Sequence, residues 1–335
     1  MRVAFYADEA GNHSRTQESS GRHRGALQVN QTPLGDAAGR EYPVPAPLPP
    51  FVRFLIAAFW TAIVFWGSGF VYLLFPGRNL LPGVLFRVVG CVLTAGGFVF
   101  FLRVLDGNFA PPSIALGLPL DRTAGRQWLV GCALGGLFIG ADVLCIAIWG
   151  SLRLYVHLNV PMLLRSGLVA VLLLSGALME ELSFRGYPFQ KLTETFGAFG
   201  AVLVLSALFG AVHLNNPEAQ GWLSWSFFNT LGVGVVFALA RIRSGSLWFP
   251  FGLHFGWNLF QGAVFGLPVS GLTDFHSIIT ASVRGPVALT GGGYGPEASA
   301  ICSMILVVAV PLVWIFTSTS KIQHRPASHL PASSI

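Results

Sequence analysis

The sequence predicts an all-α polytopic membrane protein with about eight transmembrane helices around an intramembrane cavity. The chain has 335 residues, of which 53% are hydrophobic and only 10% are charged. Soluble domains carry about 25% charged residues, because a surface in water needs them. The mean hydropathy is +0.65. These values exclude a water-soluble protein of this length and place much of its surface in lipid.

Eight apolar stretches are long enough to cross the hydrocarbon core, which needs about 20 residues of helix. They lie at 52–75, 84–104, 127–149, 162–187, 197–214, 222–241, 246–267 and 299–318. Helix breakers separate most of them: Pro76-Gly77 and Pro82-Gly83 after the first, Pro111-Pro112 and Pro119 after the second, Pro161 before the fourth, and Asn215-Asn216-Pro217 after the fifth. Because such residues end helices, we expect each stretch to form its own spanning helix.

The two ends of the chain differ from these stretches. Residues 1–50 hold five Arg and five acidic residues and end in a Pro-rich run, with no apolar core of a secretory signal peptide. We expect a disordered cytoplasmic tail at 1–50 and a second tail at 321–335. Between them we expect three transmembrane helices without diagnostic motifs at 51–160 and a domain of five transmembrane helices at 161–320.

Basic residues predict the orientation, because cytoplasmic loops carry an excess of Lys and Arg. With eight spans and a cytoplasmic N-terminus, fifteen of the 20 Lys and Arg residues fall on the cytoplasmic side and five on the other. We therefore expect both termini to be cytoplasmic. No Lys/Arg cluster indicates a nucleic-acid partner. The four Cys residues lie in apolar runs without a CxxC pair, which is typical of buried residues rather than of a disulfide frame or metal knuckle.

Ionisable side chains inside the predicted spans gather in three places. The fourth span carries Glu180-Glu181-x-x-x-Arg185, the fifth ends near His213, and the seventh carries His254-x-x-x-Asn258. Such groups are costly in a membrane, so each indicates a functional site. Asp142 stands alone in the third span, and we assign it a structural or partner role.

Helix geometry separates the two glutamates. Residues four apart share a helix face, so Glu181 and Arg185 can form an ion pair. Glu180 lies 100° away on the helix and five residues from Arg185, which leaves its carboxylate free for chemistry. His254 and Asn258 share one face of their helix. A cavity between the three helices can therefore collect these groups.

Two kinds of chemistry fit such a cavity. A carboxylate in a low-dielectric site is a competent general base for water, so Glu180 with His213 can activate a nucleophile. His254 and Asn258 can then donate hydrogen bonds to a developing oxyanion. Alternatively, Glu180, His213 and His254 can bind Zn²⁺ with water as the fourth ligand. The residues leave open whether the site needs no cofactor or uses zinc.

Other interpretations are compatible with each cluster taken alone. A buried Glu–Arg pair can simply join helices, a histidine near a span end can be interfacial, and a His-x-x-x-Asn pair can form inter-helix hydrogen bonds. Together the clusters can also form the proton or substrate path of a transporter. No HExxH, GxGD or GxSG motif occurs, which excludes the usual zinc, aspartyl and rhomboid types of intramembrane protease.

The three motifs in this order resemble those of the CPBP intramembrane proteases, the family of CAAX-type endopeptidases and bacteriocin-processing relatives. The similarity extends to Arg185-Gly186-Tyr187, to Gly252-Leu253-His254 and, as in prokaryotic members, to the Gly-rich run that ends at Glu297. It covers about residues 162–300. Any one motif is weak, whereas all three on separate apolar helices are specific.

The resemblance implies an eight-helix fold with a conical catalytic cavity open to the cytoplasm. It implies that Glu180 and His213 activate water, that His254 and Asn258 hold the oxyanion, and that Glu181 and Arg185 position the site. The implied partners are membrane lipids and a membrane-associated protein or peptide substrate. A non-catalytic regulator or immunity protein of the same family remains an alternative.

The depth of His213 disagrees with this picture. It lies about 16 residues into the fifth stretch, roughly 24 Å at 1.5 Å per residue. The same rise places Glu180 roughly 16 Å and His254 roughly 12 Å from that side of the membrane. His213 can meet them only if its helix starts later than residue 197 or begins outside the core.

Overall fold

The computed structural model describes residues 34–35, 41–42, 47–74, 80–149, 151–156, 159–273, 275 and 277–317. The chain forms two compact units, Met1–Ala46 and Pro47–Ile335. In the first unit, β1 (Leu34–Gly35) pairs with β2 (Glu41–Tyr42) in an antiparallel arrangement. The tails predicted at 1–50 and 321–335 lie almost wholly outside the described residues.

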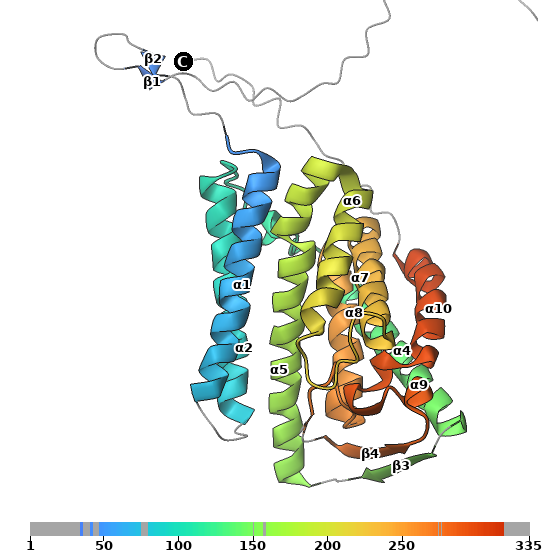
Figure 1. Ribbon diagram of the computed structural model, residues 1–335. Helices are drawn as coiled ribbons and strands as arrows, with labels where there is room; N and C mark the ends of the chain where they lie inside the picture. Colours follow the sequence, from blue (N-terminus) through green and yellow to red (C-terminus); the bar gives the residue numbers. More distant parts are fainter. Residues whose placement is uncertain are drawn as a thin grey trace, which may run out of the picture. The chain divides into compact units, whose positions relative to one another are not determined.

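Helices make up nearly all of the second unit (Figure 1). The long helices are α1 (Pro50–Leu74), α2 (Leu80–Val104), α4 (Ala124–Trp149), α5 (Val160–Arg185), α6 (Tyr187–His213), α7 (Trp225–Ser244), α8 (Trp248–Asn258) and α10 (Ala300–Phe316). A π-helix, η1 (Leu259–Val264), continues α8. Helices thus occupy all eight expected stretches, and the prediction of an all-α polytopic membrane protein is confirmed. Five described helical segments are long and apolar enough to cross a membrane, the fourth of which combines α5 and α6.

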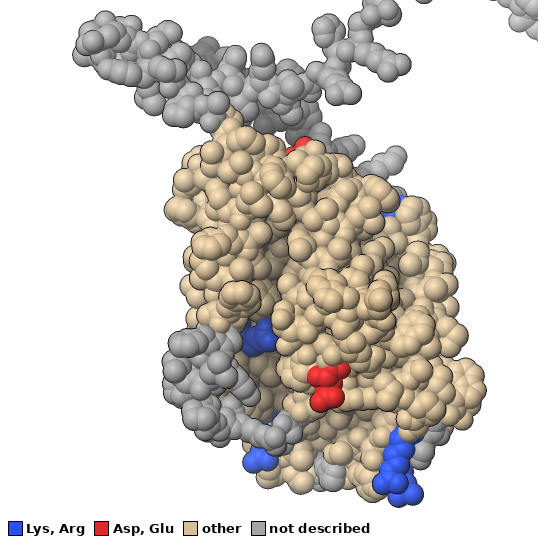
Figure 2. Space-filling view, in the orientation of Figure 1, with Lys and Arg blue, Asp and Glu red and all other residues tan. Residues whose placement is uncertain are grey.

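The surface of the second unit is that of a protein in lipid. Large apolar side chains are exposed on several helices, for example Phe59 (70%), Trp66 (80%), Phe199 (77%) and Val307 (74%). In Figure 2 only scattered charged side chains interrupt an uncharged face. An apolar surface of this extent would aggregate in water, and the chain is therefore an integral membrane protein.

Side-chain caps set where four of the helices begin. The Asp121 carboxylate accepts hydrogen bonds from the Thr123 and Ala124 backbone N–H groups before α4, and these bonds with that of the Thr123 hydroxyl lower the pKa of Asp121. Asn159 caps α5 through the Met162 N–H, and Ser224 and Ser299 cap α7 and α10. Caps satisfy N–H groups that lack helical partners, so these helices start within three residues of the predicted positions.

A break in α6 removes the disagreement over the depth of His213. The helix is interrupted at Gly197, where φ is +74° and ψ is 170°. The ten residues 187–196 lie between the end of α5 and this break, and Phe196 packs edge-on against Phe51 at the start of α1. At 1.5 Å per residue they extend about 15 Å. The fifth span therefore starts well beyond the end of α5 and has the length to bring His213 back to the site.

Four glycines dock α8 directly on α4. A Cβ atom at Gly131 or Gly135 would collide with the backbone of α8 at Phe249 or Leu253. In the other direction, a Cβ at Gly252 or Gly256 would collide with the α4 backbone at Trp128 or Cys132. Both helices thus carry a Gly-x-x-x-Gly pair, the spacing that permits close backbone approach in membranes. The contact fixes the height and rotation of α8.

The connections after α8 are short and irregular. They contain β4 (Ile279–Arg284), α9 (Val287–Thr290) and the 3₁₀ turns η2 (Gly292–Tyr294) and η3 (Pro296–Ala298). β4 pairs antiparallel with β3 (Ser151–Val156), from Ser151 opposite Arg284 to Val156 opposite Ile279. A further short helix, α3 (Pro112–Ala115), follows α2. The sequence predicts none of these strands, because their partners are far apart along the chain.

Candidate active site

The predicted ion pair between Glu181 and Arg185 is present and buried. Arg185 Nη1 lies 3.2 Å from Glu181 Oε1, and the two side chains are 1% and 0% exposed. Arg185 also donates to the Gly234 carbonyl at 3.0 Å, and its guanidinium lies 4.5 Å from the centre of the Phe209 ring. These contacts compensate a charge that would otherwise be unstable in this interior.

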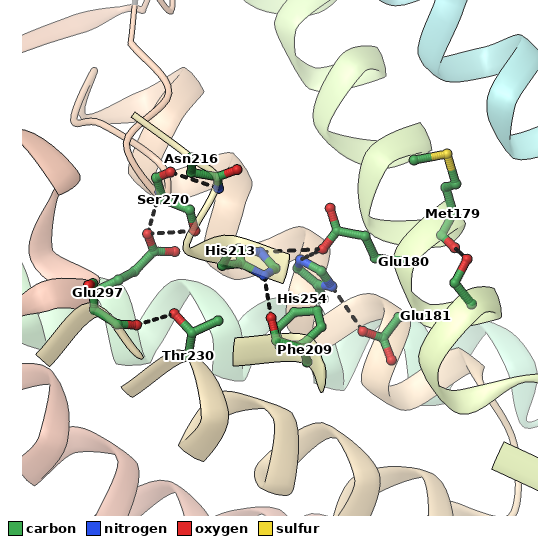
Figure 3. Close-up of polar contacts among 12 residues, drawn as sticks. Met179, Glu180, Glu181, Phe209, His213, Asn216, Thr230, His254, Ser270 and Glu297 are labelled. Carbon is green, nitrogen blue, oxygen red and sulfur yellow. Dashed lines mark hydrogen bonds and ion pairs between the residues drawn. The ribbon is translucent and has the colours of Figure 1, made fainter. Parts of the chain in front are cut away.

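His254 joins the ion pair to the cavity. Its Nδ1 lies 2.9 Å from Glu181 Oε1, so the ring donates its Nδ1 hydrogen to the carboxylate. This hydrogen bond fixes the tautomer and the orientation of the imidazole. Nε2, the other ring nitrogen, faces Glu180 at 3.7 Å from Oε2 (Figure 3).

His213 approaches the same carboxylate from the opposite helix. It is the last residue of α6, and its Nδ1 hydrogen bonds to the Phe209 carbonyl at 2.7 Å. Nε2 therefore points away from the helix and lies 4.0 Å from Glu180 Oε2. Glu180 thus faces the Nε2 atoms of two histidines at distances too long for direct hydrogen bonds. A water molecule between such groups would bridge them.

Asn258 lies on the same cavity but does not contact the other predicted residues. It is the last residue of α8, one turn beyond His254, and it is half-buried. No hydrogen bond joins its side chain to any described residue, so its amide is available to a ligand. The π-helix η1 begins directly after it, and such insertions are frequent at functional sites.

The groups surround a cavity of about 210 Å³. Its walls come from α1, α2, α5, α6, α7, α8 and the loop after η1. Glu180, His213, His254 and Asn258 all line it, whereas the buried Glu181 and Arg185 stand behind His254. Residues of all three sequence motifs therefore line one cavity.

The candidate zinc ligands do not form a compact set. Two ligands of one tetrahedral zinc, each about 2.0–2.1 Å from the ion, lie roughly 3.3 Å apart. The Glu180 oxygen lies 3.7 Å from His254 and 4.0 Å from His213. Across the described residues, no group of three or more His, Cys, Asp or Glu side chains has the spacing to hold a metal ion. We therefore derive no chemical step through a metal.

A second polar cluster borders the cavity, and only part of it was indicated by the sequence. Glu297 Oε2 accepts hydrogen bonds from the Ser270 N–H and, at 3.0 Å, from the Ser270 hydroxyl. Asn216 donates to the Ser270 carbonyl at 2.9 Å. Ser270 has a φ of +46°, an uncommon value for a residue with a side chain. The cluster holds the loop after η1 against the cavity, and its signal in the sequence was the Gly-rich run that ends at Glu297.

Asp142 lies outside this cavity. It is fully buried in α4, and neither carboxylate oxygen has a hydrogen-bond partner among the described residues. An unpaired charge in such surroundings is strongly disfavoured. Asp142 does not line the cavity, although it is close enough to Glu297, which does, for their charges to interact.

Comparisons with known proteins agree with the motifs. A family model described as "Type II CAAX prenyl endopeptidase Rce1-like" matches residues 160–260. Uncharacterized protein YyaK of Bacillus subtilis (strain 168) is 32% identical over 99 residues. This alignment covers 29% of the present chain and 32% of YyaK, about a third of each protein. No solved structure matches the chain. The predicted resemblance is thus confirmed: residues 160–260, which contain all six predicted site residues, carry the sequence pattern of the Rce1-like CAAX prenyl endopeptidases.

Proposed function

We propose that this protein is an intramembrane endopeptidase that hydrolyses a peptide bond of a membrane-associated protein or peptide. The observation that carries the proposal is the position of Glu180, whose carboxylate faces the Nε2 atoms of His213 and His254 inside a cavity between spanning helices. The family match over the same residues supports this reaction class.

Glu180 is the general base of the proposed reaction. A water held between Glu180 and His213 gives one proton to the Glu180 carboxylate while its oxygen bonds to the carbonyl carbon of the substrate. The neutral His213 presents a lone pair at Nε2, because its hydrogen is on Nδ1, and so orients that water. Proton transfer of this kind typically contributes 10²–10⁴-fold to the rate.

His254 and Asn258 hold the oxyanion that forms. Glu181 accepts the Nδ1 hydrogen of His254, so in the imidazolium form the Nε2 hydrogen is directed into the cavity. The unbound amide of Asn258 provides a second donor one turn away. When the C–N bond breaks, the proton on Glu180 passes to the leaving amine, which restores the carboxylate. Glu181 and Arg185 are positioning residues, since they act only through His254.

Comparison of membrane proteomes tests the reaction. Cells that produce the wild-type protein are compared with cells that produce Glu180→Gln, and peptides are sought whose new termini appear only with the wild type. We expect at least one such cleavage, lost in Glu180→Gln and retained in Glu194→Gln, a matched substitution of a half-exposed acid on α6. An identical set of termini in all three strains contradicts the proposal. It would favour a transporter or a regulator.

Metal removal tests the metal-free form of this mechanism. Because the candidate ligands are not spaced for one ion, we expect purified protein to lack stoichiometric zinc. We also expect cleavage of a verified substrate to continue after treatment with a chelator. Loss of cleavage that added Zn²⁺ restores would instead establish a zinc peptidase.

A further inference from the structure

Arg87 is a basic residue of the cavity that the proposed reaction does not use. It lies in α2, seven residues after Leu80, and it lines the cavity that contains Glu180. The side chain is half-buried. No described residue forms an ion pair or a hydrogen bond with it. Glu180, by contrast, lies near the Nε2 atoms of His213 and His254.

The packing of α2 on α5 gives the height of Arg87. A Cβ atom at Gly90 would lie 3.0 Å from Met179 Sδ, so these two positions are level. The helices run in the same direction, because Leu80, at the start of α2, packs against the cluster that contains Val169, while the later part of α2 packs in one cluster with Leu182 near the end of α5. Arg87, three residues before Gly90, is therefore level with the residue three before Met179. That residue is Gly176.

A small-residue surface connects Arg87 with the reactive carboxylate. Gly176 and Ala177 both line the cavity and precede Glu180 on α5 by about one helical turn, roughly 4.5–6 Å. Neither carries a side chain larger than a methyl group, so the space between the two charges is not filled. Leu172 and Leu173 complete this part of the wall. The passage is thus apolar between one cation and one carboxylate.

The Arg87 guanidinium has no counter-charge among the described residues. Arg does not lose its proton in proteins, so it cannot become neutral as a buried carboxyl group can. Charged groups inside spanning helices are costly and mark sites of substrate or ion contact. Guanidinium groups recognise carboxylates through two parallel hydrogen bonds. The partner that suits Arg87 is therefore an anion that enters the cavity.

We propose that Arg87 binds a carboxylate of the peptide substrate, supplied by its C-terminus or by an acidic side chain. The inference rests on the proposed peptidase function and names a requirement of its substrate. An extended peptide advances about 3.3–3.6 Å per residue, and along the helix axes Arg87 is offset from Glu180 by about one turn. The carboxylate recognised by Arg87 is thus within about two or three residues of the bond that is cut.

Binding to a variant that cannot cleave isolates this interaction. Glu180→Gln protein in phosphatidylcholine nanodiscs is titrated with four acylated, fluorescent apolar hexapeptides. The first ends in a free carboxylate and the second in an amide. The third and fourth are amides that carry either Glu or Gln two residues before the end. The same titrations are done with double variants that combine Glu180→Gln with Arg87→Gln, Arg87→Lys or Arg165→Gln. Arg165→Gln is the matched control, because it removes an exposed Arg of α5 that does not line the cavity.

We expect one or both carboxylate peptides to bind about 10- to 100-fold more tightly than their neutral partners, the range for a hydrogen bond to a charged group. The preference should disappear in Arg87→Gln, remain in part in Arg87→Lys and remain fully in Arg165→Gln. The first and third peptides distinguish a C-terminal carboxylate from an acidic side chain. Unfolding temperatures of all variants show whether Arg87→Gln is folded.

Three results overturn the inference. Equal binding of all four peptides to the protein that retains Arg87 would contradict a carboxylate site. A preference that persists in Arg87→Gln would contradict the assignment of that site to Arg87. Loss of co-purified phosphatidylglycerol in Arg87→Gln without a change in peptide binding assigns the residue to a lipid headgroup instead. A carboxylate preference without any Glu180-dependent cleavage in membranes would reject the peptidase function and leave the binding site established. The two failures are therefore distinguishable.

Discussion

At the scale of single residues, the buried triad of Glu181, Arg185 and His254 contributes to both the stability and the activity of the protein. Glu181→Gln keeps the shape of the side chain but leaves Arg185 without its counter-charge. Breaking a buried pair in this way costs about 3–5 kcal/mol. We therefore expect a lower unfolding temperature together with slower cleavage, because a neutral amide oxygen replaces the carboxylate that stabilises the imidazolium form of His254.

The double variant Glu181→Gln/Arg185→Met separates the two effects. It removes both buried charges, so we expect it to recover most of the stability lost in Glu181→Gln, since apolar replacement of a buried ion pair is often neutral or better. Cleavage should stay slow, because His254 still lacks its carboxylate partner. Recovery of both stability and cleavage would show that the pair serves packing alone.

Asp142 gives a contrasting prediction at the same scale. Both of its carboxylate oxygens are buried and without partners among the described residues, so a neutral amide suits the position at least as well. We expect Asp142→Asn to unfold at the same or a higher temperature and to cleave substrate at the wild-type rate. A tenfold loss of cleavage in a stable protein would instead give Asp142 a functional role.

At the scale of elements, the glycine contact between α4 and α8 controls the position of two site residues. A methyl group at Gly256 would collide with the α4 backbone, and α8 carries both His254 and Asn258. Overpacking typically costs about 1–3 kcal/mol, and we expect Gly256→Ala to lower both the unfolding temperature and the cleavage rate. Gly140→Ala is the matched control, because no atom lies within 4 Å of the added methyl group in α4. Equal behaviour of the two variants would contradict the role of the contact.

Local patterns predict helices well, because apolar runs and capping residues lie in or directly beside the helix that they determine. Asn159 and Ser299 are examples, since each stands directly before the helix that it caps. The Glu181–Arg185 pair is equally local, at four residues' separation. The convergence of His213 and His254 on Glu180 needed three separate helices and was expected only because each carried a costly polar group.

Local sequence patterns do not predict contacts between distant segments. The pairing of β3 with β4 joins residues more than 120 positions apart, and no alternation in either segment identifies its partner. The break at Gly197 depends on a backbone conformation that glycine permits without requiring. Glu297 and Ser270 meet through a loop whose path is set by backbone approach, such as that of Gly271 to Pro217. Such interactions become visible only in three dimensions.

At the scale of the whole second unit, several contacts gather the predicted cytoplasmic segments at one end. Asp106, after α2, pairs with Arg53 near the start of α1 and with Lys191 of α6. Arg243, at the end of α7, donates to the Thr317 carbonyl after α10. The start of α1 and the end of α10 therefore belong to the same side as the basic excess.

This arrangement predicts that both termini are cytoplasmic. Ile335 and Met1 lie outside the described residues, so a reporter supplies the test. We expect a fusion after Ile335 to be active only when the reporter works in the cytoplasm, and a reporter inserted between β3 and α5, near residue 158, to be active only outside. The reverse pattern would refute the orientation, and activity of both fusions on one side would refute the odd number of spans, five, expected between residue 158 and Ile335.

The ion pair within α5 also bears on how the chain is made. Glu181 and His254 are 73 residues apart, so at about 5–20 residues per second a ribosome adds the second partner roughly 4–15 s after the first. His213 follows Glu181 by 32 residues and is added roughly 2–6 s after it, so at first α5 carries its acids without either histidine. Because Arg185 follows Glu181 by a single turn, the nascent helix neutralises one of its two acids by itself. Only Glu180 then waits for the rest of the protein, and the residue assigned to the chemistry becomes fully enclosed when synthesis of the last helices is complete.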